Sequence, residues 1–243
     1  MMFDMTRIIS GFVMIAAVII IALIDVYWIN FAVFGFLLYF AFDEAKRLFD
    51  LTRASFIPVF LAFLLGSYSE KALLCGLVLV ILVVGYLVYK KAENLRLSLI
   101  YLYPTLPILA LWQVYLDEGM IRLFLLILLV VLCDSGAYFI GKMLGKTPFS
   151  QTSPNKTLEG VVGGVLCAVV GGGLVGIIMG EFWLWVVLGF FVAVLAVIGD
   201  LIESYFKRVA NLKDSGDLIP GHGGILDRID AVMIASFAMV VLL

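Results

Sequence analysis

Residues 182–203 read FWLWVVLGFFVAVLAVIGDLIE, and this stretch decides the fold class of the chain. No charged residue occurs between Phe182 and Gly199, and a helix needs about 20 mostly apolar residues to cross a bilayer. The whole chain of 243 residues has the same character, with 64% hydrophobic residues, 14% charged residues and a mean hydropathy of +1.18. A soluble domain carries about a quarter charged residues. The sequence therefore predicts an all-α polytopic membrane protein.

Other apolar runs, separated by charged or turn-forming residues, precede and follow this stretch. In chain order the runs cover residues 8–24, 26–42, 54–69, 72–89, 97–116, 121–141, 160–180, 182–203 and 226–243. This pattern predicts about nine transmembrane helices. The second, third and last runs are short, so a re-entrant segment in place of one span is an alternative.

The basic residues predict the orientation, because cytoplasmic loops of membrane proteins carry an excess of Lys and Arg. With nine spans and a cytoplasmic N-terminus, all of the 16 Lys and Arg except Lys71 and Arg122 fall on the cytoplasmic side. The C-terminus then lies outside. The net charge of −2 argues against a nucleic-acid-binding domain, which needs a basic face.

The connections between the runs divide the chain into two regions. Residues 1–120 have short and ordinary connections, and we expect an N-terminal transmembrane scaffold there. Residues 121–243 contain two long loops, 142–159 and 204–229, which are rich in Gly, Pro, Lys and Asp. We therefore expect a C-terminal transmembrane catalytic region whose function lies in these cytoplasmic loops.

Ionisable residues inside apolar spans are costly and are candidates for a functional site. Asp134 interrupts one span, and Asp200 and Glu203 lie near the end of another. Asp200, Glu203, Ser204 and Lys207 follow the spacing i, i+3, i+4 and i+7, so they share one face of a helix. One interpretation is an internal salt bridge of Asp200 or Glu203 with Lys207. The other is a metal or phosphate site.

The loop after this helix favours the second interpretation. Its charged and turn-forming residues are Lys213, Asp214, Asp217, Pro220, Gly221, His222, Gly223, Gly224, Asp227, Arg228 and Asp230. Consecutive glycines let a backbone approach a phosphate, and the helix expected after Gly224 adds a positive dipole. Aspartates supply the oxygen ligands that Mg²⁺ prefers. His222 is either a phosphate-binding or acid-base group or an exposed loop residue without a role.

The earlier loop also carries residues that suit a helix start and an anion. Ser153 or Thr157 is expected to cap the next helix, with Glu159 in its first turn and Lys156 beside its N-terminus. Within residues 160–180, glycines recur at four-residue spacing. This pattern is typical of close helix packing, and a subunit contact in a homodimer is an alternative use of it.

The polar segments resemble a known family. Residues 204–230 resemble the signature of phosphatidate cytidylyltransferases, also called CDP-diacylglycerol synthases, and residues 133–138, 153–160 and 199–200 fit the same family. The resemblance covers about the last 110 residues. Leu158 departs from the pattern, because many members have an aromatic residue there.

The resemblance implies transfer of CMP from CTP to phosphatidic acid in the lipid bilayer, at the cytoplasmic face of a bacterial inner membrane. It implies Mg²⁺ as cofactor, with a second cation as an open alternative, and metal binding by Asp200 and Asp227. The residues implied in catalysis are Lys207, Arg208, Lys213, Asp214, His222, Arg228 and Asp230. Those implied in substrate binding are Asp134, Ser153, Lys156, Thr157, Glu159, Ser204, Gly223 and Gly224.

Two alternatives stay open on the sequence. A cation-coupled membrane transporter would also place acidic residues in a helix bundle, but it predicts polar residues through the whole membrane thickness. Here the polar residues are expected at the cytoplasmic side. A related CTP-dependent enzyme acting on another lipid would have the same head-group chemistry.

Overall fold

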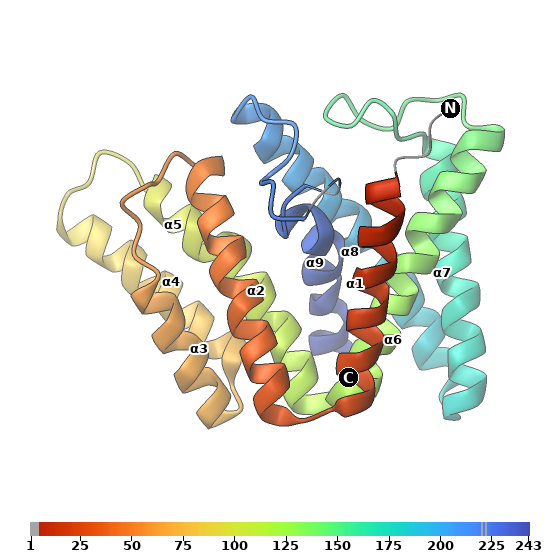
Figure 1. Cartoon of the computed structure of the whole chain (residues 1–243), viewed down its shortest axis with the longest axis horizontal. Coiled ribbons are helices and arrows are strands. Elements are labelled where there is room, and N and C mark those ends of the chain that lie inside the picture. The colour runs from red at the N-terminus through yellow and green to blue at the C-terminus, as the bar shows by residue number, and fades with distance from the viewer. Residues whose placement is uncertain (1–4, 220, 222) are drawn as a thin grey trace. The chain divides into compact units, whose positions relative to one another are not determined.

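The computed structural model describes residues 5–219, 221 and 223–243, and over these residues the chain forms helices and no strand. Each predicted apolar run coincides with helix, apart from residues at the ends of some runs. The elements are α1 (Met5–Ile24), α2 (Tyr27–Leu48), α3 (Ile57–Ser69), α4 (Ala72–Tyr89), α5 (Arg96–Ile100), the π-helical turn η1 (Tyr101–Thr105), α6 (Leu106–Leu144), α7 (Leu158–Met179), α8 (Phe182–Val209) and α9 (Leu226–Leu242) (Figure 1).

Several of these helices have the length and composition of membrane spans. Within the described residues, five stretches qualify: Tyr27–Leu48, Ala72–Tyr89, Ser98–Leu144, Leu158–Met179 and Phe182–Val209. The third has 47 residues, more than twice the about 20 that one crossing needs. It breaks at Gly119, whose φ of 75° is in the left-handed region that favours glycine. The chain is therefore an all-helical integral membrane protein, whereas nine spans and the orientation stay predictions.

The helix ends differ from the expected loop boundaries. α8 continues to Val209, so Ser204 and Lys207 lie on the same helix as Asp200 and Glu203, as their spacing predicts, and the loop expected from residue 204 begins after residue 209. Polar residues of this kind suggest that the membrane span ends before them. The helix nevertheless continues, because basic side chains such as Lys207 and Arg208 in the last turn stabilise the negative end of the helix dipole. The other expected loop, 142–159, is also shorter, because α6 extends to Leu144 and α7 begins at Leu158.

The chain divides into two compact units. The first comprises Met1–Ile121 and Val209–Ile229, and the second comprises Arg122–Arg208 and Asp230–Leu243. The first unit therefore combines residues from both predicted regions, 1–120 and 121–243. The second unit combines two separate segments of the region 121–243. In particular, the polar segment after α8 belongs to the same unit as α2 to α5.

An aromatic core fixes the helices of the first unit. Trp112 of α6 is fully buried, and its ring lies 4.8 Å from that of Phe34 and 5.6 Å from that of Phe63, measured between centroids. Its indole N–H donates to the Ser67 hydroxyl at 2.8 Å, which in turn donates to the Phe63 carbonyl at 2.7 Å. The buried indole of Trp112 and hydroxyl of Ser67 are thus paired, and α2, α3 and α6 are held together by packing.

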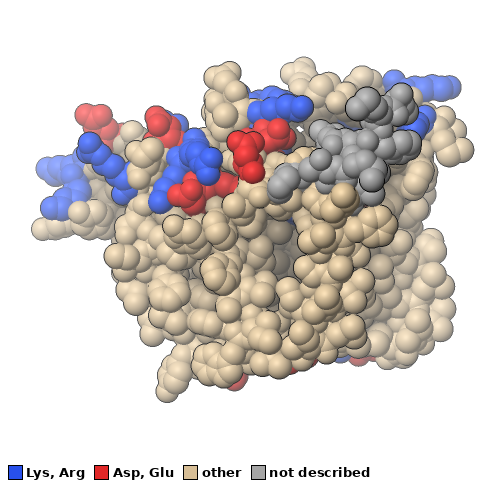
Figure 2. Space-filling model, viewed as in Figure 1, with Lys and Arg blue, Asp and Glu red and all other residues tan. Residues whose placement is uncertain are grey.

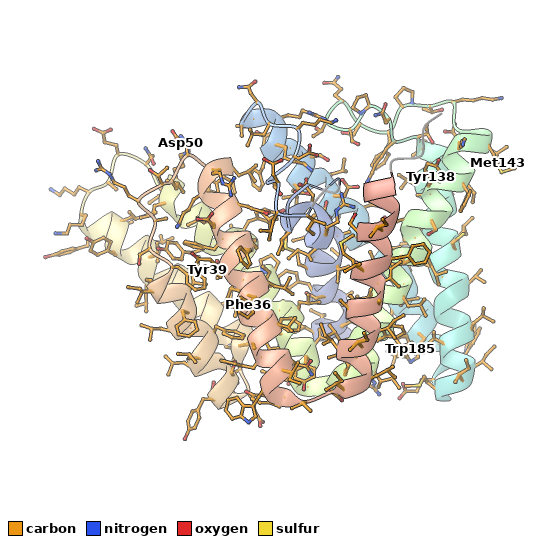
Figure 3. All side chains as sticks on the ribbon, in the orientation of Figure 1. Phe36, Tyr39, Asp50, Tyr138, Met143 and Trp185 are labelled. Atoms are coloured by element: carbon orange, nitrogen blue, oxygen red, sulfur yellow. The ribbon has the colours of Figure 1, made fainter. Side chains whose placement is uncertain are left out.

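The outer surface of the first unit suits a lipid environment. Phe36 and Tyr39 of α2 are 65% and 47% exposed, and they lie along the flank of that helix (Figure 3). Charged side chains gather instead at the end where α2 and α4 finish (Figure 2). Lys46 and Arg47 stand in the last turn of α2 there. An apolar flank with charged side chains at the helix end is the pattern expected for a helix that lies in a bilayer and ends at its surface.

Small residues let α7 pack closely against its neighbours in the second unit. A Cβ on Gly164 would lie 2.5 Å from the Cys133 carbonyl oxygen of α6, and a Cβ on Gly172 would overlap the Trp185 carbonyl of α8. Any side chain at these positions would separate the helices. The expectation of close helix packing is therefore confirmed within the chain, and a homodimer contact stays a prediction.

Candidate functional site

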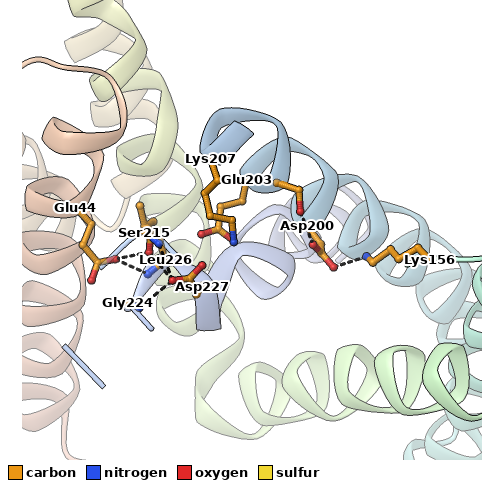
Figure 4. Close-up of polar contacts among 10 residues, drawn as sticks. Glu44, Lys156, Asp200, Glu203, Lys207, Ser215, Gly224, Leu226 and Asp227 are labelled. Carbon is orange, nitrogen blue, oxygen red and sulfur yellow. Dashed lines mark hydrogen bonds and ion pairs between the residues drawn. The ribbon is translucent and has the colours of Figure 1, made fainter. Parts of the chain in front are cut away.

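A group of hydrogen bonds surrounds the Asp227 carboxylate in the first unit (Figure 4). Its Oδ2 accepts from the Ser215 N–H at 2.8 Å, the Ser215 hydroxyl at 2.9 Å and the Gly224 N–H at 2.8 Å. Asp227 stands in the first turn of α9, where the helix dipole stabilises a negative charge. The donors converge on one oxygen atom, so they fix the orientation of this side chain.

Glu44 of α2 joins the same group, although it is far away in the sequence. Its side chain is 3% exposed. One carboxylate oxygen, Oε1, accepts from the Ile225 N–H at 2.8 Å; the other, Oε2, accepts from the Leu226 N–H at 2.9 Å and the Ser215 hydroxyl at 3.0 Å. Glu44 therefore caps the start of α9. We call Glu44, Ser215, Gly224, Ile225, Leu226 and Asp227 the Glu44–Asp227 cluster.

The sequence predicts a scaffold for residues 1–120 and does not single out Glu44 as a site residue. The sequence does carry one signal for it, which is helical spacing. Ala41 and Leu48 stand three residues before and four residues after Glu44, and both are buried. A carboxylate on such an apolar helix face needs a polar partner. The identity of that partner does not follow from the sequence.

The loop glycines are required by the backbone and by these carboxylates. Gly223 has a φ of 82°, and a Cβ there would lie 2.7 Å from Asp227 Oδ2 and 3.4 Å from the Cβ of Asp214. The Gly224 N–H, which we expected to face a substrate phosphate, donates to Asp227. In this structure the loop uses its own donors to hold Asp227, and the substrate role of Gly223 and Gly224 stays a prediction.

A second polar group lies in the other unit, on α8 and the loop before α7. Asp200 Oδ2 forms an ion pair with Lys156 Nζ, and Asp200 Oδ1 accepts from the Ser204 hydroxyl at 3.2 Å (Figure 4). The side chains of Lys156 and Asp200 are 27% and 32% exposed, so neither is fully buried. Asp134 and Asp230 lie within electrostatic range of Asp200. The structure thus brings these five predicted residues of one unit together.

The expected internal salt bridge also exists, but only one of the two carboxylates forms it. Lys207 Nζ lies 3.3 Å from Glu203 Oε2, and the two side chains are 15% and 1% exposed. Asp200 pairs with Lys156 and not with Lys207. The salt-bridge interpretation is therefore confirmed for Glu203.

The start of α7 is organised by two of the predicted residues. Thr157 is the N-cap, and its hydroxyl accepts from the Gly160 N–H at 3.2 Å, so Thr157 and not Ser153 caps this helix. The Glu159 carboxylate accepts from the Lys146 N–H at 3.1 Å, the Thr147 N–H at 3.2 Å and the Thr147 hydroxyl at 2.8 Å. Glu159 therefore ties the loop to the helix start.

The remaining predicted residues are distributed over both units. Exposed side chains belong to Arg208, Lys213, Asp214 and Arg228. In the first unit lie Lys213, Asp214, Gly223, Gly224, Asp227 and Arg228. In the second lie Asp134, Ser153, Lys156, Thr157, Glu159, Asp200, Ser204, Lys207, Arg208 and Asp230. His222 lies outside the described residues.

The donor chemistry of these carboxylates fits Mg²⁺. In the part of the chain that the structure describes, no group of three or more His, Cys, Asp and Glu side chains is arranged to hold a metal ion. Mg²⁺ usually binds through one or two carboxylates together with water and substrate phosphates, so it needs no such cage. Asp200 is partly exposed and Asp227 is half-buried, and both carry oxygen donors.

Comparison with known proteins gives a match over almost the whole chain. The model of the cytidylyltransferase family matches residues 5–243. Phosphatidate cytidylyltransferases from two strains of Helicobacter pylori, 26695 and J99, are each 39% identical over 245 aligned residues, which cover 99% of this chain and 92% of theirs. The phosphatidate cytidylyltransferase of Staphylococcus saprophyticus is 43% identical over 122 residues, 48% of this chain and 46% of that protein.

Proposed function

Since the chain belongs to the cytidylyltransferase family, we propose that it transfers CMP from CTP to phosphatidic acid, giving CDP-diacylglycerol and pyrophosphate. The observation that carries the proposal is the near full-length similarity to phosphatidate cytidylyltransferases. The membrane helices support it, because a diacyl lipid can keep its acyl chains in the bilayer while its head group reacts. Family membership favours this enzyme over the cation-coupled transporter.

The reaction needs alignment and charge neutralisation more than it needs a base. An oxygen of the phosphatidate head group, which is already ionised, attacks the α-phosphorus of CTP. A new P–O bond forms, the bond from the α-phosphorus to the bridging oxygen breaks, and pyrophosphate leaves with that electron pair. Lys156, Lys207, Arg208, Lys213 and Arg228 are the cations of this chain that we assign to neutralising these phosphates.

We assign cation binding to Asp200 and Asp227. A Mg²⁺ ion held by these carboxylates would supply positive charge to the reacting phosphates. In the first unit, Ser215 and Gly224 hold the Asp227 carboxylate in one orientation, which suits a ligand that must keep its geometry. In the second unit, Lys156 and Ser204 do the same for Asp200. A second cation, and a direct substrate role for Asp134, Asp214, Asp230 and His222, are further parts of the proposal.

We also propose nine spans, a cytoplasmic N-terminus, an external C-terminus and a site at the cytoplasmic face of a bacterial inner membrane. The distribution of Lys and Arg over alternate connections supports this topology. The break at Gly119 supports two spans within Ser98–Leu144. The cytoplasm is also where CTP is available.

Purified protein in mixed micelles with Mg²⁺ and CTP labelled at the α-phosphorus tests the activity. With phosphatidic acid we expect labelled CDP-diacylglycerol and an equal amount of pyrophosphate, and with an isoprenoid ether lipid or without lipid we expect neither. A preference for the ether lipid would assign the chain to the related CTP-dependent enzymes. A folded protein that labels no lipid would contradict the proposal and would direct attention to ion-flux assays.

A further inference from the structure

We infer that Glu44 is a positioning residue for the reaction, which holds the segment from Ser215 to Leu226 so that the Asp227 carboxylate keeps its orientation. The catalytic part of this inference rests on the proposed function. The structural part, the anchoring of the segment by Glu44, does not depend on the chemistry. The segments that carry the family resemblance in the sequence lie within about the last 110 residues, so they do not include Glu44.

Within the described residues, the hydrogen bonds of the Glu44 carboxylate go to the segment that it is inferred to hold. Its two carboxylate oxygens accept hydrogen bonds from the N–H groups of Ile225 and Leu226 and from the Ser215 hydroxyl, at 2.8, 2.9 and 3.0 Å. A carboxylate that is 3% exposed is stable only when such donors replace water. The same bonds satisfy two of the N–H groups that a helix leaves unpaired at its start. The hydrogen bonds between the Glu44 carboxylate and these N–H groups therefore hold α2 and the start of α9 together.

The helix that bears Glu44 is the rigid partner. Leu38 and Ala45 of α2 are fully buried, and Phe42 is 1% exposed. The loop, in contrast, has exposed side chains at Lys213 and Asp214, and its described residues form turns, bends and an isolated β-bridge between Ile219 and Gly223. A functional side chain is placed most accurately when a rigid element supports it. Because Glu44 is fixed on α2, its hydrogen bonds hold the loop in a defined position next to this helix.

Ser215 links Glu44 to Asp227. Its hydroxyl lies 3.0 Å from Glu44 Oε2 and 2.9 Å from Asp227 Oδ2, and its single hydrogen can be donated to one of them at a time. Its N–H donates to Asp227 in either case. If Glu44 were removed, Ser215 would lose one of its two anchors. The orientation of Asp227 would then loosen as well.

Two glycines of the loop give independent support. Gly216 and Gly224 have no φ in the left-handed region, so the backbone alone does not require glycine there. A Cβ on Gly216 would lie 2.6 Å from Glu44 Oε1, and a Cβ on Gly224 would lie 2.5 Å from both carboxylate oxygens of Glu44. These glycines therefore allow the loop to approach Glu44. At Gly216, the contact with Glu44 is thus the feature of the structure that favours glycine over a larger residue.

The test compares Glu44→Gln with Asp43→Asn, a change at its neighbour on the same helix, which is 44% exposed and pairs with Lys46 and Arg47. Glutamine keeps the size but turns one acceptor into an NH₂ group that faces N–H donors. In full-length protein in detergent, we expect amide hydrogen exchange to rise at least tenfold in peptides covering 214–227, and to stay unchanged in α7. In Asp43→Asn both regions should match the wild type.

Activity distinguishes positioning from a merely structural role. In Glu44→Gln we expect kcat for CMP transfer to fall at least tenfold and the Mg²⁺ concentration for half-maximal rate to rise severalfold. The KM for phosphatidic acid should stay within twofold. Faster exchange with an unchanged kcat would overturn the inference, and so would unchanged exchange. If the wild type itself transferred no CMP, the proposed function would be wrong. The hydrogen-exchange result would still test whether Glu44 anchors the segment from Ser215 to Leu226.

Gly216→Ala provides a second route that does not require Glu44→Gln to fold. The added methyl group meets Glu44 first, so we expect at least a tenfold loss of kcat and faster exchange in the same peptides. In a Glu44→Ala background, the methyl group has room. There Gly216→Ala should change kcat by less than threefold relative to Glu44→Ala alone. Equal effects in both backgrounds would contradict the contact and overturn the inference.

Discussion

The buried ion pair of α8 allows a quantitative prediction for Glu203→Gln. Glu203 is 1% exposed in its side chain and lies 3.3 Å from Lys207, which is 15% exposed. Replacing Glu203 by glutamine removes one carboxylate charge beside the largely buried lysine, while Asp230 stays within electrostatic range of it. Removing one member of a buried pair typically costs about 3–5 kcal/mol. Because water still reaches part of Lys207 and Asp230 still attracts it, we take the lower end, about 3 kcal/mol.

The matched control is Asp43→Asn, which breaks an ion pair of similar length at the protein surface. Asp43 lies 3.4 Å from Lys46, but the side chains are 44% and 24% exposed. Exposed pairs contribute about 0–1 kcal/mol. The two variants therefore differ mainly in burial, and the expected difference between them is about 2 kcal/mol or more.

Thermal unfolding in detergent measures the difference. A loss of about 3 kcal/mol corresponds to a fall in Tm of roughly 6–12 °C for a chain of this size, whereas the control should fall by less than about 4 °C. Glu203→Leu combined with Lys207→Met should recover most of the stability, because it removes both charges. A Tm of Glu203→Gln equal to that of Asp43→Asn would refute this prediction. A double variant with a lower Tm than Glu203→Leu alone or Lys207→Met alone would refute it as well.

Three further predictions concern the second unit and one glycine of α4. Glu159→Gln should accelerate limited proteolysis within residues 146–157 severalfold, since Glu159 accepts three hydrogen bonds that hold this loop, and an unchanged rate would contradict that role. Thr157→Ala should lower stability by about 1 kcal/mol through loss of the N-cap, measured as a lower Tm. Gly164→Leu should lower Tm strongly because α6 leaves no room for a side chain. Gly85→Ala, where a Cβ meets no atom within 4 Å, should leave Tm unchanged or slightly higher; similar effects of the two changes would argue against the packing of α7.

Short-range patterns in the sequence predict much of the fold and part of the site. Apolar runs locate the helices because a span needs length and composition alone. The spacing of Glu203 and Lys207 predicts their ion pair, since residues four apart are neighbours on a helix. Asp200 and Lys207 stand seven residues apart, about 10.5 Å along the axis, so they are too far apart to pair. The cap at Thr157 is equally local.

The contacts that the sequence does not predict are those between distant segments. Lys156, in the loop before α7, pairs with Asp200 of α8, and Glu44 reaches a loop some 170 residues later. Such pairs depend on how helices pack, and hydrophobic periodicity determines which face of a helix is buried but not which segment covers it. The buried position of Glu44 between Ala41 and Leu48 is therefore visible in the sequence, but its partners are not.

The most direct test of the central claim is Mg²⁺-dependent CMP transfer by Asp227→Asn and Asp200→Asn beside the wild type. Asparagine keeps the size of each side chain and removes the charge that we assign to cation binding. We expect wild type to form labelled CDP-diacylglycerol and both variants to lose at least a hundredfold in rate, with more Mg²⁺ required for any residual activity. Variants as active as the wild type, with the same Mg²⁺ requirement, would show that these carboxylates do not hold the cation.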